Sequence, residues 1–175
     1  IVYPPRWSML ADLAERYAAM GIVTSAAEIF ADIEMWDEVV ECYTRAGKSS
    51  TAEQIVRERL AKMETPRMWA ALGDITNEPE HYEKALKLSN GRFSNAYVSL
   101  GKFYFEQSEI VKAAEYYRKA VKIRPLLPSV WFRLGTISMQ LKDWAAALSA
   151  FTEVVQQEPQ EADAWANVAA VHMHN

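Results

Sequence analysis

One pattern of residues occurs twice in this chain, and the two copies are 34 residues apart. The first copy comprises Tyr97, Leu100, Gly101, Tyr104, Ala113, Tyr117, Ala120 and Pro125, and the second comprises Trp131, Leu134, Gly135, Ala147, Phe151, Val154 and Pro159. A fixed period of this length is typical of stacked helix pairs, each of which buries its apolar face only against its neighbours. The period therefore predicts an all-helical chain built as a solenoid.

The two glycines of the pattern have a packing explanation. Gly101 and Gly135 are expected in the middle of the first helix of a pair, where glycine costs about 1 kcal/mol relative to alanine. A close approach of the second helix would offset this cost, because a missing side chain lets two backbones come near each other. In this register the small residues Ala113 and Ala147 are expected opposite the two glycines.

The pattern resembles the signature of the tetratricopeptide repeat family, in which Trp-x2-Leu-Gly is followed by Ala-x3-Phe and Pro. Further units extend the register in both directions, including one with a shortened loop before Tyr82 and one that begins at Trp165 and contains a single helix. The resemblance implies a right-handed α-solenoid of about five helix pairs and one lone terminal helix. The predicted repeats form one solenoid over 1–175 and span approximately 7–34, 35–65, 66–93, 94–127, 128–161 and a partial 162–175.

Composition limits the alternatives. Half of the residues are hydrophobic and only six are glycine, which favours a packed helical chain over a disordered one. No run of 18 apolar residues is present, so we expect no membrane contact. Residues 1–5 contain neither an initiator methionine nor a signal pattern, and we expect a piece of a longer protein. The single cysteine, Cys42, is expected in the core of a protein of the cytosol or nucleus.

The sequence contains none of the motifs that would indicate catalysis. It has no nucleophile elbow, no His-Glu-x-x-His, no phosphate-binding glycine loop and no Cys-x-x-Cys. The one close histidine pair, His172 and His174, is two residues apart on a predicted helix. Such side chains point about 200° apart and do not hold one metal ion from a single face. We therefore predict a protein that is not an enzyme and that has no cofactor and no metal site.

Four of the six tryptophans share one position of the repeat, where the register needs a large residue. They are Trp36, Trp69, Trp131 and Trp165. We expect these four in the core between helices. Trp7 and Trp144 fall outside this position, and the sequence leaves them open between the core and the end of the stack.

A partner-binding surface follows from the family resemblance, because the first helix of each pair forms the inner wall in that family. The residues predicted to bind a partner there are Asn95, Lys102, Phe105, Phe132, Arg133, Met139, Asn167 and Met173. Phe105, Met139 and Met173 recur at one position and predict an apolar stripe with Lys102, Arg133 and Asn167 beside it. The alternative is that large residues at this position only pack neighbouring repeats.

Family members that act as chaperone adaptors grip an acidic C-terminal peptide with lysine, asparagine and arginine at set inner positions. This sequence departs from that arrangement, since Val98 stands where the first lysine is expected and Phe132 and Ala166 are apolar at the equivalent sites. A generic adaptor for chaperone tails is therefore an alternative function here. A protein client or a peptide segment is the expected partner, with chaperone complexes as a further candidate.

A narrower resemblance, to the branch of the family represented by tetratricopeptide repeat protein 27, covers most of residues 10–165. It is carried by Ala27–Phe30, Glu34–Tyr43, Arg45–Gly47, Ala52–Ile55, Glu64–Pro66, Leu72–Thr76, Tyr82–Ala85 and Leu88–Arg92. The resemblance implies a non-enzymatic assembly factor in the chaperone-linked maturation of U5 spliceosomal particle proteins. An RNA-binding helical-repeat module is the alternative. The net charge of −4 and the lack of a basic stripe argue against nucleic acid as the partner.

Overall fold

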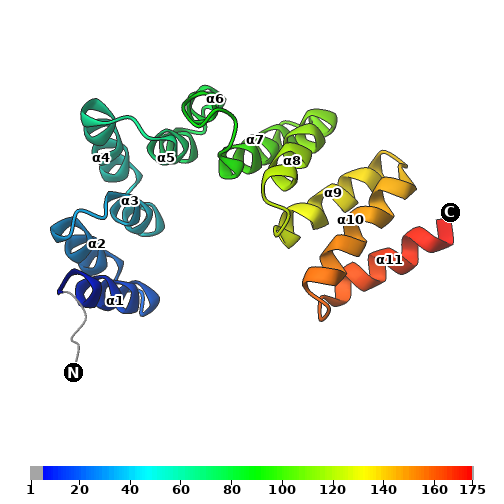
Figure 1. The fold of residues 1–175 in the computed structure, drawn as a ribbon, viewed down its shortest axis with the longest axis horizontal. Helices are drawn as coiled ribbons and strands as arrows, with labels where there is room; N and C mark the ends of the chain where they lie inside the picture. Colours follow the sequence, from blue (N-terminus) through cyan, green and yellow to red (C-terminus); the bar gives the residue numbers. More distant parts are fainter. Residues whose placement is uncertain (1–5, 175) are drawn as a thin grey trace. The chain divides into compact units, whose positions relative to one another are not determined.

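The computed structural model describes residues 6–174, which contain eleven α-helices (Figure 1). The helices are α1 (Arg6–Ala19), α2 (Val23–Asp32), α3 (Trp36–Arg45), α4 (Ser49–Lys62), α5 (Pro66–Thr76), α6 (Pro79–Leu88), α7 (Ser94–Glu106), α8 (Ile110–Ile123), α9 (Pro128–Gln140), α10 (Trp144–Gln157) and α11 (Ala162–His174). The predicted architecture of five helix pairs and one terminal helix is confirmed. Residues 1–5, on which the expectation about the chain start rests, lie outside the described residues. None of the described helices has the length and apolar character needed to cross a membrane.

The chain divides into two compact units, Ile1–Leu88 with α1–α6 and Ser89–Asn175 with α7–α11. Within the second unit α7 packs against α8, α9 against α10, and α10 against α11 (Figure 1). Within the first unit each helix likewise packs against the one that follows it, as the nearest-neighbour logic of a repeat protein requires. The single solenoid expected over residues 1–175 stays a prediction.

Five helices, α1, α2, α3, α7 and α9, end in the same tight turn. After α9 the N–H of Lys142 donates to the carbonyl of Met139 at 3.0 Å, and the N–H of Asp143 donates to the carbonyl of Ser138 at 2.8 Å. This pair of bonds is a Schellman motif, which satisfies the last carbonyls of a helix. Asp143 then caps α10, because its Oδ1 accepts from the N–H of Ala146 at 3.1 Å. The turn therefore ends one helix and starts the next within three residues.

The Schellman turn requires one residue in the left-handed region of the backbone. That residue is Gly21 after α1 and Gly47 after α3, with φ angles of 81° and 73°. Glu34, Ser108 and Lys142 occupy it after α2, α7 and α9, with φ angles of 59°, 64° and 59°. A residue with a Cβ pays roughly 1–2 kcal/mol for this conformation. Three of these five turns therefore carry backbone strain.

The close approach of α9 and α10 is centred on a glycine and an aromatic ring. A Cβ added to Gly135 would lie 2.7 Å from Cε1 of Phe151, a residue that has no exposed surface. The residue nearest to Gly135 is Phe151, whereas the sequence led us to expect Ala147, one turn earlier on the same helix. The reason is the size of the gap: the space freed by the missing Cβ is filled by a planar ring rather than by a second backbone.

The same contact recurs in two other helix pairs. A Cβ on Gly101 would lie 2.6 Å from Cδ1 of Tyr117, and one on Gly73 would lie 2.7 Å from Cε1 of Tyr82. Tyr117 is fully buried and Tyr82 is nearly so. The glycine, which is a weak helix former, is thus explained by the ring that rests on it.

Two of the repeat tryptophans bind the end of the preceding repeat. Nε1 of Trp131 donates to the carbonyl of Pro125 at 2.8 Å, and Nε1 of Trp165 donates to the carbonyl of Pro159 at 2.9 Å. These carbonyls follow the last turns of α8 and α10, where proline prevents the helix from continuing. Nε2 of Gln157 adds a second bond to the Pro125 carbonyl at 3.0 Å, which ties α10 to the same loop.

We expected the four repeat tryptophans in the core, but one of them is exposed and the other three are only half-buried. Trp165 is 52% exposed, whereas Trp36, Trp69 and Trp131 lie half-buried at the edges of core clusters. For Trp131 and Trp165, the hydrogen bond to a loop carbonyl keeps one edge of the indole near solvent. Nε1 of Trp36, by contrast, is buried and has no hydrogen-bond partner among the described residues. The two open cases are resolved as well, since Trp7 is exposed and Trp144 packs against the cluster around Phe151.

We predict that Lys142→Gly stabilises the chain by up to about 1 kcal/mol, because glycine removes the strain of the left-handed conformation and loses part of this gain as chain entropy. Urea unfolding followed by circular dichroism measures the change. Lys142→Ala is the control, since alanine keeps the Cβ and should give no gain. An equal stabilisation by alanine would show that the charge of Lys142, and not its φ of 59°, matters here.

We predict that Gly135→Ala destabilises the chain by about 1–3 kcal/mol despite the better helix propensity of alanine, because the buried ring of Phe151 has no room to withdraw. A double-mutant cycle with Phe151→Leu is the control. The cost of Gly135→Ala should fall by more than about 0.5 kcal/mol when the ring is absent. An alanine variant as stable as the parent would refute the contact as a constraint on helix spacing.

Candidate partner-binding groove

The second unit contains a groove of about 710 Å³ between α7, α9 and the start of α11. Its lining residues are Phe105, Pro128, Ser129, Phe132, Arg133, Thr136, Val154, Glu158, Glu161 and Asp163. Pockets that hold small ligands or the anchoring side chains of a peptide have volumes of this order. The groove is therefore large enough to receive a few side chains of a partner.

One face of α9 supplies half of the lining. Ser129, Phe132, Arg133 and Thr136 follow the spacing i, i+3, i+4, i+7 that places residues on one side of a helix. Pro128 precedes them as the first residue of α9, where its missing N–H has no helical partner in any case. The sequence of this helix alone thus places four groove residues side by side.

The apolar part of the groove consists mainly of two half-buried rings, Phe105 from α7 and Phe132 from α9. Phe132 is held in place because it packs edge-to-face on Phe151, with ring centroids 5.5 Å apart and an interplanar angle of 76°. Such aromatic pairs contribute roughly 0.5–1.5 kcal/mol beyond the area they bury. The ring that rests on Gly135 therefore also fixes the side chain at the centre of the groove.

The charges around the groove are unequal. Glu158, Glu161 and Asp163 come from the end of α10, the following loop and the start of α11, and Arg133 is the one cation of the lining. Within the described residues none of the three carboxylates forms an ion pair. The groove is thus an apolar surface with an acidic side.

Arg133 interacts with the buried side chain of Tyr117. Burial raises the pKa of the Tyr117 hydroxyl, and the positive charge of Arg133 opposes that rise. Tyr117 is fully buried, and Arg133 is the basic side chain that acts on its hydroxyl. The guanidinium of Arg133 therefore lies between a buried hydroxyl and the groove.

Three of the eight residues predicted to bind a partner, Phe105, Phe132 and Arg133, line this groove. Lys102 does not; its exposed Nζ lies 3.9 Å from Oε1 of Glu106 one helical turn away. Asn95 is exposed at the start of α7 and is outside the lining as well. A partner contact at any of these residues stays a prediction.

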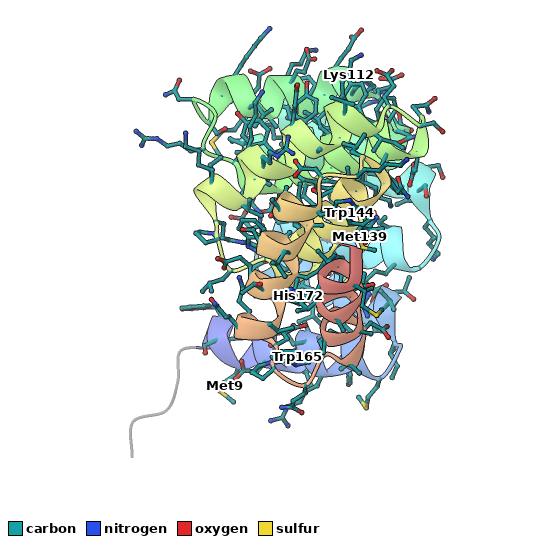
Figure 2. All side chains as sticks on the ribbon, turned by 90° about the vertical axis from the view of Figure 1, so that its right-hand side faces the viewer. Met9, Lys112, Met139, Trp144, Trp165 and His172 are labelled. Carbon is teal, nitrogen blue, oxygen red and sulfur yellow. The ribbon has the colours of Figure 1, made fainter. Side chains whose placement is uncertain are left out.

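The residues of the predicted apolar stripe have different surroundings. Phe105 lines the groove, whereas Met139 packs on the cluster around Phe151, near Trp144 at the turn between α9 and α10 (Figure 2). Met173 is 81% exposed, and Asn167 is half-buried on α11. In this structure the three positions do not share one burial state, so they differ in what a mutation would disturb.

Counting inward-facing positions along the first helix of each repeat also places Ser129, Thr136 and Asp163 on the inner wall. The four other lining residues are outside that count: Pro128, Val154, Glu158 and Glu161. Val154, Glu158 and Glu161 come from the second helix of a pair or the loop after it. The signal that could have found the two glutamates is their closeness to Asp163 in the sequence.

The cysteine and the histidines singled out in the sequence show no features of a metal or catalytic site among the described residues. Cys42 is buried, and this burial raises the pKa of its thiol above the usual value. His172 is exposed on α11, and the side chain of His174 lies outside the described residues (Figure 2). No group of three or more metal-binding side chains is found in the part of the chain that the structure describes.

Known proteins share both the sequence pattern and the fold. Models of the tetratricopeptide repeat match residues 94–125 and residues 132–175. In the crystal structure of the APC/C heterotetramer Cut9–Hcn1, one chain is similar with a TM-score of 0.69 and 16% identity, over 96% of this chain and 36% of that chain. The chain belongs to the tetratricopeptide repeat family, whose members are protein-interaction scaffolds.

Within this family the chain is similar to named relatives. It is 40% identical to the tetratricopeptide repeat protein 27 homolog of Dictyostelium discoideum over 140 residues, which are 80% of this chain and 16% of that protein. It is 34% identical to a TPR repeat-containing protein of Schizosaccharomyces pombe over 171 residues, which are 97% of this chain and 21% of that protein. The chain thus spans about a fifth of the length of the relatives it matches.

We predict that single-stranded RNA binds weakly, with a Kd of about 10⁻⁴–10⁻⁶ M at physiological salt and with no sequence preference, because three carboxylates and one guanidinium line the groove. Filter binding with poly(U) and with mixed-sequence RNA measures this. A sub-micromolar complex that depends on sequence and persists at about 200 mM salt would contradict a protein scaffold and favour an RNA-binding module.

Proposed function

We propose that this chain is a binding segment of a non-enzymatic assembly factor and that it holds a protein client through the groove in its second unit. The observation that carries this proposal is the groove itself, whose rings Phe105 and Phe132 are half-buried yet line an open volume of about 710 Å³. Apolar anchors beside charged groups are the usual parts of a peptide-binding surface.

The finer part of the proposal concerns the client. Resemblance to tetratricopeptide repeat protein 27 supports a role in the chaperone-linked maturation of U5 spliceosomal particle proteins, in the cytoplasm and also the nucleus. The residues that would carry it are the predicted partner-binding set, Asn95, Lys102, Phe105, Phe132, Arg133, Met139, Asn167 and Met173. Chaperone complexes would then be bound together with the client.

Met139 is a poor probe of this groove, because its truncation would remove packing from the cluster around Phe151. Ser129 is a better one. It is exposed in the first turn of α9 and lines the groove, so a large side chain at this position fills the volume without opening a cavity in the core. Phe105→Ala removes an anchor from α7, and because Phe105 also packs against the core cluster around Tyr117, its effect on binding is compared with its thermal melt.

We predict that Ser129→Trp and Phe105→Ala each reduce the recovery of the large U5 proteins at least about fivefold when the full-length protein is purified from cells, because each removes about 1 kcal/mol or more of binding. Quantitative mass spectrometry against the intact protein measures the loss. Val111→Ala is the control, since Val111 is 59% exposed on α8 and does not line the groove.

Circular dichroism and thermal melting of each variant show whether the fold is kept. If U5 proteins are recovered equally with all variants, the groove is not the client site. If no U5 protein is enriched over a control purification, the proposed client is wrong while the assignment to a scaffold family stands.

A further inference from the structure

The charge around the groove limits which partners fit it. Glu158 and Asp163 are exposed and Glu161 is half-buried, and all three line the same volume as Phe105 and Phe132. Bringing carboxylates together raises their mutual repulsion, and an apolar wall beside them weakens the screening by water. A partner with positive charge would relieve this repulsion.

Of the three carboxylates, Glu158 is the one whose negative charge the helix dipole disfavours. It is the C-cap residue of α10, and its N–H donates to the carbonyl of Val154 at 2.7 Å. The C-terminus of a helix carries partial negative charge, so a carboxylate there is unfavourable by roughly 0.3–1 kcal/mol. Asp163, by contrast, lies in the first turn of α11, where the dipole favours a negative charge. The dipoles therefore explain Asp163 and leave Glu158 without compensation.

The cation on the other side of the groove does not balance these charges. Arg133 interacts with the buried Tyr117 hydroxyl and forms no ion pair with the three carboxylates in the described part of the chain. Lys102, the nearest lysine of the predicted rim, is outside the lining and faces Glu106. The lining therefore has a net charge of −2 if Arg133 is counted with the three carboxylates.

We propose that the groove takes a protein segment that places a lysine or arginine against Glu158, Glu161 and Asp163 and an apolar side chain against Phe105 and Phe132. This inference rests on the proposed scaffold function and adds the chemistry of the partner. It is the opposite charge preference to that of a groove that grips an acidic C-terminal peptide, since a carboxylate would meet three like charges and one guanidinium. Cationic groups also gain from the aromatic rings, because a cation is attracted to a ring face.

Three matched peptides test the proposal with the whole chain. The first is acetyl-Ser-Lys-Phe-Lys-Leu-Ser-amide, and the other two replace both lysines by glutamine or by glutamate. Isothermal titration calorimetry at low and at physiological salt measures each Kd. We expect the lysine peptide to bind at least about tenfold more tightly than the glutamate peptide, with the glutamine peptide between them, and we expect the difference to shrink as salt screens the charges.

A triple variant, Glu158→Gln, Glu161→Gln and Asp163→Asn, should remove this preference and weaken the lysine peptide about tenfold. The control variant removes three exposed carboxylates outside the groove, with the substitutions Glu28→Gln, Glu83→Gln and Glu115→Gln. It has the same net charge as the triple variant, so it separates a local contact from the overall field. It should keep the preference for lysine.

Three results would overturn the proposal: equal or tighter binding of the glutamate peptide, a lysine preference that survives the triple variant, or no binding of the lysine peptide at about 1 mM. These outcomes are distinct from failure of the scaffold function. If Ser129→Trp still releases the client while the peptides show no charge preference, the groove binds a client of other chemistry. If the lysine peptide behaves as expected and Ser129→Trp releases no U5 protein, the partner chemistry holds and the proposed client is wrong.

Discussion

The contact between a glycine in the first helix and an aromatic ring in the second sets the spacing on which the other contacts of a helix pair depend. Gly135 leaves room for the ring of Phe151, and any Cβ at that position would enter the ring's van der Waals surface. Because the ring is fully buried, it has no free direction in which to move. The two helices therefore have one preferred distance. This distance determines how the other side chains between them pack.

The distance between α9 and α10 also affects the groove, because Phe132 contacts both Phe151 and the groove. The Phe151 ring that touches Gly135 also packs edge-to-face on Phe132, which lines the groove. One aromatic residue thus connects the constraint on the backbone with the surface that would meet a partner. Groove and core residues share α9: Gly135 faces inward, whereas Arg133, two residues before it, and Thr136, directly after it, face the groove.

The tryptophans show a different kind of link, between successive repeats. Trp131 and Trp165 reach the carbonyls of Pro125 and Pro159, which the end of the preceding helix leaves without a helical partner. A proline stops the helix, and the indole N–H of the next repeat donates a hydrogen bond to the carbonyl of that proline. At Trp131 and Trp165 the large residue of this position therefore makes a hydrogen bond at the edge of the core as well as packing contacts.

The sequence by itself determined the eleven helices and their pairing. The 34-residue period of the later repeats, the prolines after α4, α8 and α10 and the glycine shared by α5, α7 and α9 all follow from local chemistry, which repeats whenever the residues repeat. The face of α9 that carries Phe132 and Arg133 could also be predicted, because helical spacing alone places them together. What only the tertiary structure decided is which residue rests on Gly135 and which residues complete the groove. Ala147 and Phe151 are one turn apart on the same face of α10, so the position of that helix along its own axis relative to α9 decides that the ring rests on Gly135. Glu158 and Glu161 line the same groove as Phe105 of α7 because α10 packs against α9, which lies between them in the chain. No local sequence pattern records that these three residues come together.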